Sequence, residues 1–178
     1  MIYTGSYKNC LKGNLISISG DRGKSVGFQG ACFSALAPKL SFWKIWHDNI
    51  GKISNNINNY YYIEQYYQQV LKKLDPNEII DFFIDGTIFL CYEDNLEFCH
   101  RHIVAYWLEK TLNINVPEVK VDEVGNIIVL NRPSWIKQIL DDVIAKDKSQ
   151  EVPVKQLIKV PNHYDPNLEF FKKCTERK

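Results

Sequence analysis

The fold of this chain is decided by residues 87–108, which read Thr-Ile-Phe-Leu-Cys-Tyr-Glu-Asp-Asn-Leu-Glu-Phe-Cys-His-Arg-His-Ile-Val-Ala-Tyr-Trp-Leu. The short apolar run at residues 88–91 is typical of a strand that is buried on both faces. From about residue 96, apolar side chains recur at helical spacing, so that Ile103 and Trp107 share one stripe. Between the predicted strand and helix lie the most reactive side chains: Cys91, Glu93, Cys99, His100, Arg101 and His102. Ligands bind outside the carboxyl ends of strands in open α/β sheets, so this pattern predicts a site here.

The remaining segments fit the same α/β pattern. We expect strands at residues 1–4 and 15–19, turn material at 55–59, an amphipathic helix at 60–74, a short helix from Pro76, a hairpin of strands at 119–121 and 127–130, and helices from Ser134 and Pro166. These elements predict a three-layer α/β fold with a mainly parallel sheet flanked by helices. Residues 1–113 would form the core. Residues 114–178 would be a C-terminal α+β extension packed on the same domain.

Composition narrows the class of protein. The 178 residues suit one domain with a substantial core. With 22 basic and 21 acidic residues the chain is almost neutral, so nucleic acid is not the favoured partner, although a local basic patch is compatible with it. The apolar runs are too short to span a bilayer, and we expect no membrane partner. The sequence gives no oligomeric state.

The number and spacing of the cysteines indicate the cellular compartment in which the protein works. The five cysteines are odd in number and irregularly spaced, which does not fit a secreted disulfide framework. Residues 1–5 have neither a basic leader nor an apolar signal core. We therefore expect reduced thiols and a cytoplasmic location.

A glycine-rich loop at residues 20–30 follows the second predicted strand. The loop contains Gly23-Lys24-Ser25, but a phosphate-binding loop needs a glycine five residues before Gly23, where Ile18 stands. Two interpretations stay open: Arg22 and Lys24 hold an anionic ligand, or the loop is a solvated surface segment.

The sulfur and imidazole groups have several possible uses. Structural zinc sites use close cysteine pairs, whereas Cys91 and Cys99 are eight residues apart. Cys99 and His100, as neighbours on a helix, would point about 100° apart, so we expect no metal and no cofactor, and His100 would be a poor base for a Cys99 nucleophile. The helix dipole would favour a Cys99 thiolate. The alternative is that both cysteines are small buried apolar groups.

The polar residues around the predicted helix start suggest roles for a site. His100 should point inward, with its pKa lowered by the helix dipole, or else be a satisfied core histidine. Arg101 could grip a carboxylate or phosphate, and Glu93 could accept hydrogen bonds from a ligand, act as a base, or cap the helix. His102 should be exposed.

These motifs resemble the family called domain of unknown function 488. The resemblance rests on Leu90-Cys91-Tyr92-Glu93, on Cys99-His100-Arg101-His102 and on Ile2-Tyr3-Thr4-Gly5-Ser6, with weaker support from Ile16-Ser17-Ile18-Ser19, Leu36-Ala37-Pro38 and Leu74-Asp75-Pro76, and covers about residues 1–112. It implies an α/β fold with a mainly parallel sheet and the motif residues at one end. It implies no reaction, but a cytoplasmic protein of prokaryotic or phage origin. The last 65 or so residues depart from the compact members.

The expected site lies at the carboxyl edge of the sheet. Its candidate ligand-binding residues are Tyr3, Thr4, Ser6, Ser19, Arg22, Lys24, Cys91, Glu93, Cys99, His100 and Arg101. The expected function is binding of a small anionic, nucleotide-like ligand. The alternative is a hydrolase or transferase acting on a nucleotide N-glycosidic or phosphate bond, with Glu93 and His100 as its catalytic residues. The residues leave open whether the protein is an enzyme.

Overall fold

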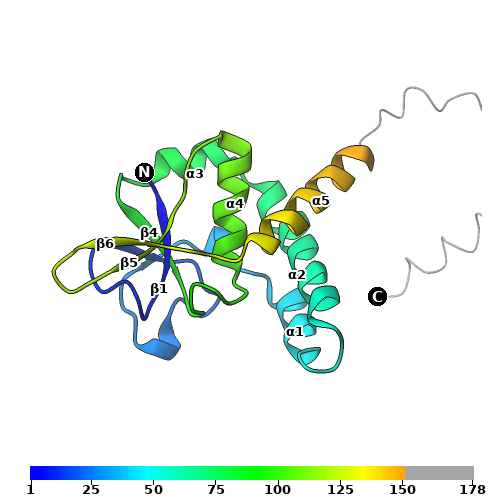
Figure 1. Cartoon of the computed structure of the whole chain (residues 1–178), viewed down its shortest axis with the longest axis horizontal. Helices are drawn as coiled ribbons and strands as arrows, with labels where there is room; N and C mark the ends of the chain where they lie inside the picture. Colours follow the sequence, from blue (N-terminus) through cyan, green and yellow to red (C-terminus); the bar gives the residue numbers. More distant parts are fainter. Residues whose placement is uncertain (151–178) are drawn as a thin grey trace, which may run out of the picture. The chain divides into compact units, whose positions relative to one another are not determined.

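The protein is an α/β fold built on a mixed, mostly parallel sheet. The computed structural model describes residues 1–150, and one compact unit spans Met1–Lys146 (Figure 1). The strands are β1 (Tyr3–Ser6), β2 (Asn14–Ser17), β3 (Ala31–Cys32), β4 (Thr87–Cys91), β5 (Glu118–Val121) and β6 (Ile127–Leu130). The helices are α1 (Leu40–Asp48), α2 (Asn55–Gln69), α3 (Pro76–Phe82), α4 (His100–Leu112) and α5 (Ser134–Gln150). The helix predicted from Pro166 lies outside the described residues.

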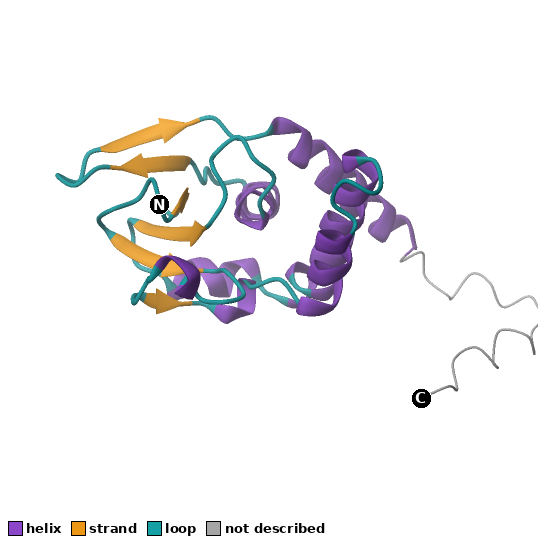
Figure 2. Ribbon diagram, turned by 90° about the horizontal axis from the view of Figure 1, so that it is seen from below, coloured by secondary structure: helices purple, strands orange, loops and turns teal. Residues whose placement is uncertain are grey.

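The strands lie in the order β3-β2-β4-β1-β5-β6, and Figure 2 shows them side by side. Every pair is parallel except the β5–β6 hairpin. All five residues of β4 are buried, which confirms the prediction of a strand covered on both faces. Because β5 pairs with β1, residues after 113 extend the same sheet. The mainly parallel α/β fold is therefore confirmed.

The two faces of the sheet are covered differently. The five α-helices of the described residues all contribute to one apolar cluster, which includes Phe89 of β4. The second cluster contains Ile88 and Leu90 of β4, and partly buried Tyr7 and Phe28 from loops pack against it. The expected three-layer arrangement is not confirmed, because within residues 1–150 the helices contribute to only one of these clusters.

Three helix boundaries differ from the prediction, and one of them is the end of α2, which lies at Gln69 instead of residue 74. Residues 55–59, expected to form a turn, are the first part of α2. Here Asn58 Nδ2 donates to the Trp46 carbonyl at 2.8 Å and Trp46 Nε1 donates to Asn59 Oδ1 at 3.0 Å, so tertiary contacts outweigh the low helix propensity of asparagine. The helix expected from about residue 96 begins at His100.

The position of His102 also corrects the sequence analysis. Its side chain is buried rather than exposed, because residues 100–108 of α4 are all buried. A helix covered all round shows no polar face in the fold, so the periodicity of its sequence does not identify an exposed side. None of the helices in residues 1–150 is both long and apolar enough to cross a membrane.

We predict that Gly5→Ala lowers the free energy of unfolding by about 1–3 kcal/mol, since overpacking a core forces neighbours to shift. A Cβ at this β1 position would lie 2.4 Å from Cys10 Sγ and 3.0 Å from the Val119 carbonyl oxygen. Urea denaturation measures the change. Gly20→Ala is the matched control, because its Cβ would meet nothing within 4 Å. Equal losses in the two variants would contradict the close packing of β1.

Candidate functional site

A cavity of about 570 Å³ opens at the carboxyl ends of β2 and β4. One part of its lining is aromatic and comes from α1, α2 and the segment before α4: Trp43, Trp46, Tyr62 and Phe98. The other part is polar and follows the two strands, with Ser19, Asp21, Tyr92 and Glu93. Small-molecule sites have volumes of about 300–1,000 Å³ and combine apolar walls with a few polar groups, so this cavity has the form of a ligand site.

Two buried thiols and an imidazole stand together in the cavity wall. Cys91 is the last residue of β4, Cys99 immediately precedes α4, and His100 is the first residue of α4. Cys91 Sγ lies 3.5 Å from His100 Nδ1, and Cys99 Sγ lies 3.9 Å from the same nitrogen. The other ring nitrogen, Nε2, is 2.9 Å from the Ile18 carbonyl oxygen, an acceptor, so Nε2 carries hydrogen and Nδ1 faces the sulfurs.

The backbone of Cys99 explains why neighbouring side chains converge. Its φ of −149° and ψ of 145° are extended, so the residue caps the helix instead of belonging to it. The 100° separation expected for helical neighbours does not apply to Cys99 and His100. The geometric reason for expecting that these two groups could not act together is therefore wrong.

Glu93 places a half-buried carboxylate beside this group. Its Oε2 accepts a hydrogen bond from Cys91 Sγ at 3.4 Å and lies 4.0 Å from Arg101 Nη1. Burial raises the pKa of the Glu93 carboxyl to about 7, and the neighbouring Cys99 sulfur adds to the rise. The carboxyl group therefore lies in a setting that favours its neutral form more than water does.

The two thiols have pKa shifts of opposite direction. Burial, followed by the neighbouring Cys99, raises the pKa of the Cys91 thiol. Burial also opposes ionisation of Cys99, but contacts with Cys91, Arg101 and His100 outweigh it and lower the pKa of Cys99. The pKa of His100 is raised, since interactions with Cys99 and Glu93 outweigh burial. The lowering expected from the helix dipole is thus wrong.

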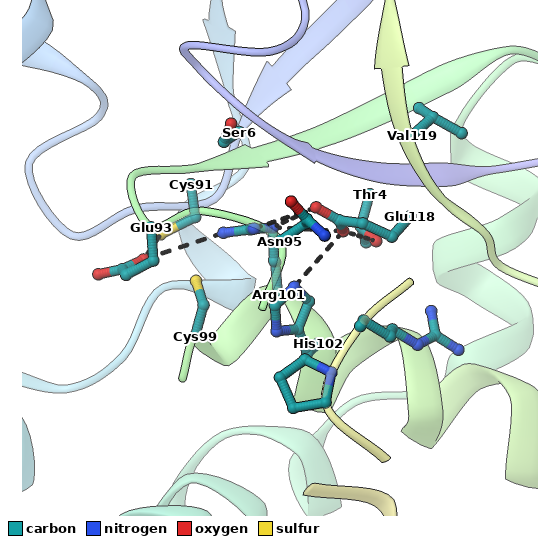
Figure 3. Close-up of polar contacts among 12 residues, drawn as sticks. Thr4, Ser6, Cys91, Glu93, Asn95, Cys99, Arg101, His102, Glu118 and Val119 are labelled. Carbon is teal, nitrogen blue, oxygen red and sulfur yellow. Dashed lines mark hydrogen bonds and ion pairs between the residues drawn. The ribbon is translucent and has the colours of Figure 1, made fainter. Parts of the chain in front are cut away.

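A buried ion pair lies behind this cavity wall (Figure 3). Arg101 Nε and Nη2 donate to Glu118 Oε1 at 3.1 and 3.0 Å, and both side chains are fully buried. Thr4 Oγ1 donates to Glu118 Oε2 at 2.7 Å, and His102 Nε2 lies 3.6 Å from that same oxygen. The pair connects the first turn of α4 to β5 and β1.

A second carboxylate organises the loop after β2. Asp21 accepts hydrogen bonds from the backbone N–H groups of Gly23 and Ser25, and from the hydroxyls of Ser19, Ser25 and Tyr92. Burial opposes its ionisation, but these donors outweigh it and lower the pKa of Asp21. Asp21 therefore holds the loop in place on the polar side of the cavity.

The structure brings together only part of the predicted site. Ser19, Cys91, Glu93, Cys99 and His100 line the cavity. The remaining predicted residues do not: Tyr3 packs on the second apolar cluster, Thr4 and Ser6 are buried, Arg22 and Lys24 are exposed, and Arg101 is paired with Glu118. Among residues 1–150, no lysine or arginine lines this cavity.

Several lining residues are absent from the list of candidate residues predicted from the sequence. They are Gly20, Asp21, Ser25, Pro38, Leu40, Trp43, Trp46, Tyr62, Tyr92 and Phe98. The aromatic density of residues 42–47 was a signal for α1, but nothing in the sequence indicated that this helix closes over the end of the sheet. Glu118 gave no signal either, because it lies 17 residues after its partner Arg101.

Comparisons with protein-family models, with curated proteins and with solved structures find no match to this chain. The resemblance to domain of unknown function 488 therefore stays a prediction. The function has to be argued from the cavity and the groups around it.

We predict that Glu118→Gln lowers the free energy of unfolding by about 3–5 kcal/mol, because Arg101 loses its fully buried anionic partner and keeps only the half-buried Glu93 carboxylate, 4.0 Å away. Urea denaturation measures the loss. Asp48→Asn is the matched control, since it removes an exposed ion pair with Lys44 and should change stability little. If both variants lost similar amounts of unfolding free energy, the buried Arg101–Glu118 pair would contribute no more to stability than an exposed ion pair.

Proposed function

We propose that the protein binds a small molecule with a planar aromatic ring, of the nucleoside or nucleotide class, in the cavity at the carboxyl edge of the sheet. The single observation that carries this proposal is the composition of the cavity wall, which combines indole and phenyl rings with hydroxyl and carboxylate groups. Aromatic side chains stack on bases of any sequence, and oxygen acceptors suit the amino and hydroxyl donors of a nucleoside.

Trp43 is the best candidate for stacking. It lines the cavity, 37% of its surface is exposed, and its only ring partner among the described residues is His47, whose ring centroid is 4.9 Å away. Trp46, in contrast, packs against Tyr62 and Phe98 and donates its N–H to Asn59. Trp46 therefore has a structural role, whereas Trp43 presents a ring to a ligand.

The charges in the cavity favour the ring and sugar over the phosphate as the recognised part. Asp21 is held in its charged form on the polar side of the cavity, and a phosphate would be repelled by that charge. Glu93, whose pKa is raised to about 7, adds to the repulsion in its ionised form. A phosphate group would have to lie outside the polar lining; Arg22 and Lys24 are exposed on the loop that carries Asp21. Affinity for a nucleoside should accordingly equal or exceed that for its 5′-monophosphate.

We predict that Trp43→Ala weakens binding of the tightest member of a panel of nucleosides and 5′-monophosphates by about 5- to 150-fold, the loss of about 1–3 kcal/mol that removal of one stacking ring causes. Isothermal titration calorimetry measures the affinity. Phe82→Ala is the control, because Phe82 is an exposed aromatic residue outside the cavity wall. If no panel member binds, or if both variants bind equally, the proposed function is wrong.

The second candidate is an enzyme that acts on an N-glycosidic or phosphate bond of the same ligand class. It is favoured by the position of Glu93, a carboxylate that reaches the cavity beside a thiol. A carboxylate in such a place acts as a general base or a nucleophile.

We predict that, if the enzyme reading holds, Glu93→Gln abolishes product formation and leaves the affinity for the ligand within a few-fold of the original. Chromatography of a reaction with the tightest panel member detects free base or phosphate. Glu97→Gln is the control, because Glu97 is exposed and does not line the cavity. Absence of product with the unmodified protein would leave binding as the function and remove the enzymatic alternative.

A further inference from the structure

Three buried side chains direct two sulfurs and one nitrogen at a common point. The residues Cys91, Cys99 and His100 are 3%, 2% and 6% exposed, and their sulfur and nitrogen ligand atoms all lie within 4.8 Å of one another. Within residues 1–150, no other group of three His, Cys, Asp or Glu side chains is arranged in this way.

The two sulfur–nitrogen distances are close to those that a tetrahedral metal ion imposes. Zinc–sulfur bonds of about 2.3 Å and zinc–nitrogen bonds of about 2.0–2.1 Å place the sulfur and nitrogen ligands about 3.6 Å apart at a tetrahedral angle. The observed separations from His100 Nδ1 are 3.5 Å to Cys91 Sγ and 3.9 Å to Cys99 Sγ. A cation would fit between these atoms with only small side-chain movements.

The imidazole is oriented as metal-binding histidines are. A ligating histidine almost always donates its second ring N–H to a carbonyl or carboxylate, which fixes the tautomer and the ring plane. His100 Nε2 donates to the Ile18 carbonyl oxygen at 2.9 Å, and its Nδ1 is thereby turned to the sulfurs. Ile18 is itself fully buried, directly after β2, so this acceptor is held by the sheet.

We propose that Cys91, Cys99 and His100 bind a divalent cation of the zinc class, with the fourth coordination position open to the cavity. Two thiolates and an imidazole suit Zn²⁺ and exclude Mg²⁺ and Ca²⁺, which take oxygen ligands. Three protein ligands with one open position are the arrangement of catalytic zinc sites, whereas structural sites use four. The site does not depend on the proposed nucleoside-like ligand.

The surroundings of the three ligands fit a bound cation. All three line the cavity, which gives a solvent molecule or a ligand access to the fourth position. Glu93 Oε2, 3.4 Å from Cys91 Sγ, would accept a hydrogen bond from a metal-bound water. The two negative charges of the thiolates would balance those of a divalent cation. Arg101 is already paired with Glu118, so the buried charges sum to zero without a contribution from Glu93.

The test is metal analysis of the full chain purified without chelators and then saturated with Zn²⁺ or Co²⁺. We expect about one equivalent of Zn²⁺ by mass spectrometry, and with Co²⁺ a thiolate-to-metal charge-transfer band and the strong visible absorption of a tetrahedral site. Cys91→Ser and Cys99→Ser should each lower the affinity for Co²⁺ at least tenfold and weaken the charge-transfer band.

Cys32→Ser is the matched control, because Cys32 is exposed and lies outside the group. It should leave metal content and spectrum unchanged. Less than a tenth of an equivalent of metal in the folded, saturated protein would overturn the proposal. A Co²⁺ spectrum that is the same in the Cys91→Ser and Cys32→Ser proteins would overturn it equally.

A measurement on the unmodified chain covers the case in which the cysteine variants fail to fold. Thiol labelling of the folded protein should modify two more cysteines after treatment with a chelator than before it, and the melting temperature should fall and recover when Zn²⁺ is restored. Unchanged labelling and an unchanged melting temperature would overturn the proposal. Peptide mapping should assign the two additional labels to Cys91 and Cys99.

Discussion

The salt bridge between Arg101 and Glu118 is the contact on which the arrangement of the site depends. It joins the first turn of α4 to β5, and Thr4 of β1 binds the same carboxylate. A buried guanidinium needs a carboxylate in a fixed geometry, and removal of one partner leaves a costly buried charge. The pair therefore restricts how α4 can rotate and shift against the sheet. Arg101 and Glu118 thus support the position of α4 and do not themselves line the cavity.

The fixed start of α4 determines what the cavity wall contains. Cys99 precedes the helix in an extended conformation and His100 opens it, so both side chains turn to Cys91 at the end of β4. The loop after β2 completes the wall, because Ile18 orients His100 and Asp21 holds the segment that follows. The chemical groups of the site thus come from two adjacent parallel strands and the helix after one of them, as expected at the carboxyl edge of such a sheet.

The two proposals assign different parts of the cavity to different tasks. The aromatic wall formed with α1 and α2 would receive the ring of a ligand, and the sulfur and imidazole groups would hold a cation. Glu93 lines the cavity beside Cys91 and has a part in both proposals. Either proposal can fail without the other, since Trp43 contributes nothing to the cation site and Cys99 contributes no stacking surface.

The sequence predicted much of the frame. The apolar run at residues 88–91 predicted β4, and the motif after it located the site at the end of that strand, because both signals are local. The Asp75-Pro76 start of α3 was also predicted, and Asp75 accepts a hydrogen bond from the Asn77 backbone N–H at 2.8 Å. Contacts between residues far apart in the sequence could not be predicted from it. Arg101 was assigned to a ligand because nothing in the sequence indicates Glu118 as its partner.

The residues of the cavity wall also show that local sequence patterns do not predict long-range packing. Trp43 and Tyr62 reach the cavity only because α1 and α2 pack beside the end of the sheet, and no local pattern encodes that packing. The convergence of Cys99 and His100 depends on one residue having extended instead of helical angles. A boundary difference of a few residues, from about 96 to 100, was enough to reverse the conclusion about which side chains can meet.

The most direct measurement is mass spectrometry of the small molecules retained by the chain after incubation with an equimolar mixture of nucleosides and nucleotides and removal of unbound material. The unmodified protein should retain one member of the mixture in near-stoichiometric amount, and the Trp43→Ala protein should retain far less of it. Retention of nothing by the unmodified protein, or equal retention by the two proteins, would contradict the claim that this cavity is the binding site.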